Sequence, residues 1–168
     1  MRLGLNRPLM NWSYNMCAKY KNVDEIYDLL RSFEDGSVAR DVWKHAEHLV
    51  VALCYLEEHD LETAIKKMRD GIFDLLRNGF GVDLTKEMPY HETLTVFWMR
   101  TVYAYSLMMK DAPLLEKANG IVDLFDKDYP LRFYSKELLF SDRARTEFVE
   151  PDLGFEEYFE PVLTGAAL

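Results

Sequence analysis

The chain has 168 residues, of which 49% are apolar and 14% aromatic, and its formal net charge is −9. This length and composition fit one folded domain, and the negative charge disfavours nucleic acids and anionic membrane surfaces as partners because both carry phosphate groups. No apolar run is long enough to span a bilayer, and the two cysteines, Cys17 and Cys54, are too few for a disulfide scaffold. We therefore expect a reduced, cytoplasmic protein with no membrane partner, and its composition is compatible with a homo-oligomer.

Helical periodicity runs through most of the chain, and alternating strand patterns are absent. The pattern predicts five helices, from Asn22 to Gly36, about Ser37 to Glu58, Asp60 to Gly79, Pro89 to Met109, and about Pro113 to Phe125. Residues 1–21 form a leader of unclear structure, short helices and turns follow residue 129, and residues 151–168 are expected to be a peripheral tail. The predicted fold class is all-α: one domain over residues 1–168, a helical bundle of four to six helices with an irregular C-terminal segment.

Two histidines lie three residues apart on the second predicted helix. An advance of 100° per residue gathers the apolar side chains on one core face, formed by Val38, Val42, Leu49, Leu53 and Leu56. His45 lies inside the edge of this face, His48 lies roughly 60° further round, and Asp41 falls between them. Glu47 points away from the core.

The third histidine of interest, His91, lies in the first turn of the fourth predicted helix, beside its inner face. The positive end of the helix dipole opposes protonation there, so the ring should stay neutral, which is the form that binds metal. Helices in a bundle pack about 8–10 Å apart, a separation that lets His45, His48 and His91 converge on a single ion. The sequence thus predicts a metal site with these three ligands, and zinc or iron as the metal.

Two neighbours of His91 are the predicted catalytic residues. Glu92 is either a fourth ligand or a general base toward bound water, and Tyr90 donates to the substrate. Arg69, near the inner stripe of the third helix, either clamps a substrate carboxylate, pairs with Glu92, or forms an ordinary surface ion pair. An acid in the first turn of a helix also stabilises the helix dipole, which explains Glu92 without catalysis.

The motifs "HAEHL", "MRDGI" and "YHETLT", followed by "YSKELLFSDRARTEFVEPDL", carry a resemblance. The chain resembles a family of uncharacterised bacterial all-helical proteins with a His-x-Asp/Glu-His motif and a Tyr-His-Glu-Thr-Ile/Leu-Thr motif. The match covers roughly residues 40–153. By this resemblance the shared site residues are those of the two motifs, His45, Glu47 and His48 in the first and Tyr90, His91, Glu92, Thr93 and Thr95 in the second.

These observations predict a small helical metalloprotein, a metal-dependent enzyme that acts on a small molecule through a histidine-rich site between two helices. Asp41, Glu47, Arg69 and Thr95 are secondary candidates for that site. The alternative is a non-catalytic interaction module, in which the histidines and acids form a structural hydrogen-bond network and the acidic, aromatic tail engages a partner.

Overall fold

The computed structural model describes residues 18–153 and contains seven α-helices and no strand in this range. Five longer helices form the body: α1 (Val23–Glu34), α2 (His45–Glu58), α3 (Leu61–Asp74), α4 (Glu92–Met108) and α5 (Leu114–Leu124). A π-helical turn, Leu75–Gly79, continues α3, and a 3-10 turn, Tyr129–Arg132, precedes the short helices α6 (Lys136–Leu139) and α7 (Asp142–Thr146). The predicted fold class, an all-α bundle with an irregular C-terminal segment, is confirmed.

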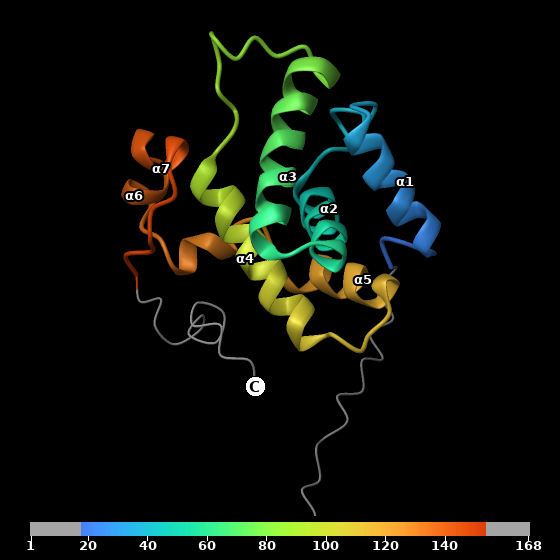
Figure 1. Ribbon diagram of the computed structural model, residues 1–168. Coiled ribbons are helices and arrows are strands. Elements are labelled where there is room, and N and C mark those ends of the chain that lie inside the picture. Colours follow the sequence, from blue (N-terminus) through green and yellow to red (C-terminus); the bar gives the residue numbers. More distant parts are fainter. Residues whose placement is uncertain (1–17, 154–168) are drawn as a thin grey trace, which may run out of the picture.

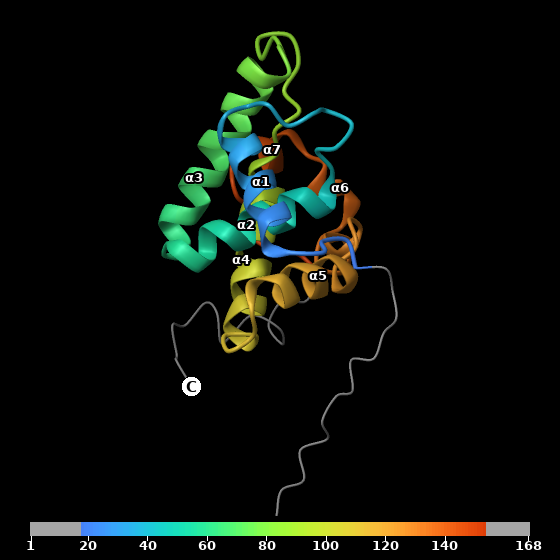
Figure 2. The same ribbon diagram turned by 90° about the vertical axis from the view of Figure 1, so that its right-hand side faces the viewer.

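Helix α2 is the central element of the bundle. It packs against α1, α3, α4 and α5, which surround it in both views (Figures 1 and 2). Every residue from Leu49 to Leu56 is buried, so this helix is apolar on all sides over two turns. A helix of this kind is stable only inside a protein, because each face needs an apolar partner. Two of these surrounding helices, α3 and α4, supply the other walls of the candidate site.

The ends of α1 and α3 follow from their capping residues. The side chain of Asn22 accepts a hydrogen bond from the backbone N–H of Glu25 at 3.0 Å, and the side chain of Asp60 accepts one from Thr63 at 2.8 Å. Each cap satisfies an N–H group that has no partner within the helix. The chain leaves α1 through Gly36, whose φ of +74° lies in the left-handed region that favours glycine. These helix limits agree with the sequence prediction.

The start of α2 differs from the prediction. The helix begins at His45 instead of about Ser37, because the preceding segment forms turns and the N–H of Val38 bonds back to a carbonyl of α1. Val42, which was expected on the core face, is 49% exposed. Asp41 is also exposed and is not part of the helix, so its predicted place on a stripe with the histidines is wrong.

Residues 129–153 cover the N-terminal half of α4 (Figure 1). Their apolar side chains and one from α4 form a second core, made of Phe97, Phe133, Tyr134, Leu139, Ala144 and Val149. The hydroxyl of Thr93 donates to the carbonyl of Glu147 at 2.9 Å and accepts from the N–H of Val149 at 3.1 Å. The C-terminal segment is therefore bound to the start of α4.

Some of the sequence predictions lie outside the described residues. These are the predictions for Cys17, for most of the leader and for the tail beyond residue 153. In the part of the chain that the structure describes, no helix has the length and apolar character needed to cross a membrane.

Candidate functional site

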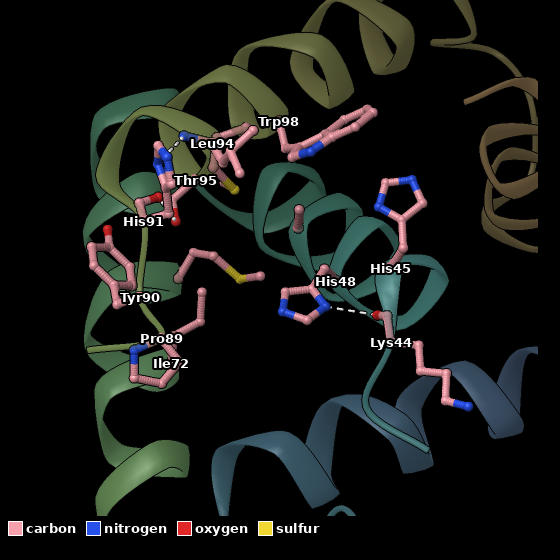
Figure 3. Close-up of a pocket in the computed structure, with 13 residues that line it drawn as sticks. Lys44, His45, His48, Ile72, Pro89, Tyr90, His91, Leu94, Thr95 and Trp98 are labelled. Atoms are coloured by element: carbon pink, nitrogen blue, oxygen red, sulfur yellow. Dashed lines mark hydrogen bonds between the residues drawn. The ribbon is translucent and has the colours of Figure 1, made fainter. Parts of the chain in front are cut away.

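A cavity of about 270 Å³ lies between α2, α3, α4 and the segment that leads into α4 (Figure 3). We call it the histidine pocket. Its polar lining consists of Lys44, His45, His48, Tyr90, His91 and Thr95. The structure thus brings the three histidines singled out in the sequence to the walls of one cavity, although they come from two different helices.

His91 is the N-cap of α4, and both of its ring nitrogens have backbone partners. Nδ1 accepts from the N–H of Leu94 at 3.3 Å, which requires Nε2 to carry the proton that it donates to the carbonyl of Leu139 at 2.8 Å. Burial lowers the pKa of His91, and the nearby positive charge of Arg145 acts in the same direction. The ring is therefore neutral and, in this arrangement, has no nitrogen left to bind a ligand.

His45 has one ring nitrogen bound to the backbone. Its Nε2 donates to the carbonyl of Phe125 at 3.0 Å, and its ring lies 4.7 Å from the ring of Trp98. With Nε2 carrying the proton, the lone pair of the imidazole is on Nδ1. Figure 3 shows this ring turned toward Trp98 and away from His48.

His48 is bound to the backbone through Nδ1, whereas His45 is bound through Nε2. Nδ1 donates to the carbonyl of Lys44 at 2.7 Å, which leaves the lone pair on Nε2. The imidazole packs 4.1 Å from the ring of Trp43, which in turn stacks on Phe33 at 4.7 Å. Figure 3 shows the ring directed toward Ile72, with Nε2 facing the cavity. Burial lowers the pKa of His48, so the ring is neutral at neutral pH and Nε2 is a hydrogen-bond acceptor.

Metal-binding capacity depends on which donor atoms meet in space. Within residues 18–153, no group of three or more His, Cys, Asp or Glu side chains is arranged to hold a metal ion. Nδ1 of His45 and Nε2 of His48 are the imidazole nitrogens of the pocket that keep a lone pair. A metal bound here would need further ligands from outside this set, such as water or a substrate.

Glu92, the predicted general base, is bound in an ion-pair network beside the pocket. Arg69 donates to both carboxylate oxygens of Glu92, from Nε at 3.0 Å and also from a terminal nitrogen. The hydroxyl of Tyr90 donates to the same carboxylate. Burial opposes ionisation of Glu92, but these hydrogen bonds outweigh it and lower its pKa, whereas burial raises the pKa of Tyr90 to about 12. The structure therefore brings Glu92, Arg69 and Tyr90 together, and of these three Tyr90 lines the pocket.

The remaining secondary candidates have different surroundings. Thr95 lines the pocket, and its hydroxyl donates to the carbonyl of His91 at 3.0 Å. Glu47 was expected to point away from the core, but it is 5% exposed, because the segment before α1 covers this side of α2. There Lys19 pairs with the Glu47 carboxylate at 2.7 Å, and the N–H of Lys44 donates to it at 3.1 Å. Glu47 thus stabilises the start of α2.

The apolar walls of the pocket were not identified as a site in the sequence. They consist of Ala52, Met68, Ile72, Pro89, Leu94, Trp98 and Met99. Met68 and Ile72 follow helical spacing, and such spacing indicates burial without distinguishing a cavity wall from a filled core. The support of His48 by Trp43 had no sequence signal, because Trp43 precedes the helix and the two residues are not related by helical spacing.

Comparison with family models, with curated proteins and with solved structures finds no match for this chain.

Proposed function

We propose that this protein binds a small organic molecule in the histidine pocket. The cavity, at about 270 Å³, is slightly smaller than the usual small-molecule sites of about 300–1,000 Å³. Its lining combines an apolar majority with a few placed polar groups, which is the composition typical of such sites. A ligand smaller than a typical drug therefore fits the space.

The observation that carries this proposal is the arrangement of His48. Its Nδ1 is bound to the carbonyl of Lys44 and its ring face is supported by Trp43, so that the imidazole is fixed before any ligand arrives. The free nitrogen, Nε2, faces the cavity (Figure 3). Within residues 18–153, Nε2 has no hydrogen-bond partner from the protein. A fixed acceptor in an apolar cavity gives a ligand both binding energy and orientation.

A ligand-binding experiment tests this proposal. Neutral fragments are added to the labelled protein, and binding is followed by amide chemical-shift changes. We expect hits that perturb the residues around the pocket and that are lost in Ala52→Leu, which fills the cavity from α2, a buried position. Ala39→Leu, at an exposed position outside the pocket, is the matched control and should bind normally. Hits that survive Ala52→Leu, or a complete absence of hits, would contradict the proposal.

A metal-dependent enzyme is a second proposal, and one observation favours it. His45 and His48 each donate one ring N–H to a backbone carbonyl, at 3.0 and 2.7 Å, and keep a lone pair on the other nitrogen. Histidines that bind metals are commonly oriented by such hydrogen bonds from the second nitrogen. In this proposal the two histidines would hold zinc or iron, and the metal would act as a Lewis acid toward a small-molecule substrate.

Metal analysis of protein purified without an affinity tag tests the second proposal. About one equivalent of zinc or iron, lost in both His45→Ala and His48→Ala, would support it. His59→Ala is the control, because this ring makes no hydrogen bond within the described residues. Protein that contains no metal and takes none up on titration would contradict this proposal and leave the small-molecule proposal intact.

A further inference from the structure

The hydrogen-bonding groups around the histidine pocket are mostly satisfied within the protein. Tyr90 donates its hydroxyl to Glu92, and Thr95 donates its hydroxyl to the carbonyl of His91. His91 itself uses both nitrogens on backbone groups. Nδ1 of His45 and Nε2 of His48 are acceptors without a protein donor among the described residues; the His45 ring is turned toward Trp98, whereas Nε2 of His48 faces the cavity (Figure 3). A ligand that brings a donor would satisfy it.

The charge of the lining also limits the ligand. No Asp or Glu side chain lines the pocket within the described part of the chain, so a cation would find no counter-charge. Lys44 lines the cavity through its backbone end, and Figure 3 shows its ammonium group directed away from the cavity. An anion would therefore enter an apolar space without a cation to pair with it, at a high desolvation cost. A neutral molecule is the class that these walls fit.

The side chains of the walls favour an aromatic ligand. Tyr90 and Trp98 line the cavity together with Met68 and Met99, which are 3% and 1% exposed. Thioether sulfur makes favourable contacts with aromatic rings, and the unbranched methionine side chain can change its rotamer to pack against a flat ligand. Aromatic faces also attract one another in offset or edge-to-face arrangements.

We infer that the ligand of the histidine pocket is a flat, neutral aromatic molecule that donates an N–H or O–H group to Nε2 of His48. This inference rests on the proposed small-molecule function and specifies its ligand class. It gives His48 the role of a recognition residue, whose neutral ring accepts the ligand's proton donor, while Trp43 and the Lys44 carbonyl hold the ring in place.

A matched pair of probes tests the inference. Indole and benzofuran have nearly the same shape, but indole has an N–H donor where benzofuran has an oxygen. Titration of each into the full-length protein, followed by amide chemical shifts, gives the two dissociation constants. We expect indole to bind about tenfold more tightly, the ratio expected when one hydrogen bond to the protein is lost. In His48→Phe, which keeps a flat ring against Trp43, the ratio should fall to about one.

Each outcome of this experiment has a distinct meaning. Equal binding of the two probes to the wild-type protein would overturn the donor inference while leaving the small-molecule proposal in place. Binding of neither probe at millimolar concentration would overturn the proposed function together with the inference. A preference for indole that persists in folded His48→Phe, as judged by its thermal unfolding, would show that another group accepts the N–H and would also overturn the inference. The comparison in the wild-type protein does not depend on whether this variant folds.

Discussion

Nε2 of His91 donates to the carbonyl of Leu139 at 2.8 Å, across 48 positions of the chain. The same ring caps α4 through Nδ1, so one side chain joins the start of α4 to the end of α6. Both bonds require the neutral ring with its proton on Nε2. This relationship gives His91 a structural role at the pocket wall.

Replacing His91 should therefore destabilise the protein. We expect His91→Ala to lower the free energy of unfolding by about 2–3 kcal/mol, because it removes a helix cap and leaves a buried carbonyl without a donor. Denaturant unfolding measures this loss, with His59→Ala as the control. The measurement is repeated with a chelator and with added zinc. A loss that appears only when zinc is present would instead indicate that His91 acts as a metal ligand, as predicted from the sequence.

The network of Arg69, Glu92 and Tyr90 predicts coupled effects on stability. Glu92→Gln removes the charge that Arg69 binds and should cost about 1–3 kcal/mol, and Tyr90→Phe should cost about 0.5–1.5 kcal/mol. The Tyr90 hydroxyl donates to the Glu92 carboxylate, so the two substitutions affect the same contact. The double variant should therefore lose less unfolding free energy than the two single variants lose together, by about 0.5 kcal/mol or more. Additive losses in denaturant unfolding would show that the two contacts are independent. The predicted role of Glu92 as a general base needs its own test, once a substrate is known.

Stability should fall as the solution becomes mildly acidic. Burial lowers the pKa values of both His48 and His91 in the folded protein below their ordinary value of 6.5. A depressed pKa means that the unfolded chain binds protons first, so the contribution of each ring is complete above pH 6.5 and decreases below it. The loss is at most about 1.4 kcal/mol per pH unit for each histidine.

Thermal unfolding between pH 7.5 and pH 5.5 tests this pH dependence. The carboxyl groups of Asp35, Asp60, Asp83 and Asp152 also have lowered pKa values because of hydrogen bonds, but their contributions are lost only well below this window. We expect a lower Tm at pH 5.5, and a smaller pH dependence in His91→Ala. An unchanged Tm across this range would contradict the assignment of neutral, buried rings.

The sequence predicts the parts of this structure that depend on local patterns. Two helices begin at Asn22 and Asp60 as expected, and helical spacing places His45 and His48 together, whereas His91 reaches the same cavity through the packing of α4 on α2. Other features depend on partners distant in sequence. The burial of Glu47 needs Lys19, and the second bond of His91 needs Leu139, and no periodic signal marks either partner. The late start of α2 has a nearer cause, since the N–H of Val38, before the helix, bonds to the carbonyl of Ser32 in α1.

Trp43, which supports His48, is itself supported through Phe33 by a glycine of α3. Gly71 lies in the last turn of α3, which the π-helical turn Leu75–Gly79 continues, and a Cβ placed on it would lie 2.5 Å from Cε1 of Phe33. The Phe33 ring stacks on Trp43 at 4.7 Å, and the Trp43 ring packs on His48. The absence of a side chain at Gly71 thus lets this row of rings reach the histidine pocket.

Gly71→Ala should therefore destabilise the protein, although alanine has the higher helix propensity. The propensity gain is about 1 kcal/mol, whereas overpacking against Phe33 costs about 1–3 kcal/mol, so we expect a net loss of up to about 2 kcal/mol. Phe33→Leu on its own should also be destabilising, but the double variant should be more stable than the sum of the two single losses predicts, because the smaller side chain makes room for the new methyl group. Denaturant unfolding of the four proteins measures this coupling. A stabilised Gly71→Ala would show that Phe33 moves aside freely, and the row of rings would then not be what fixes His48.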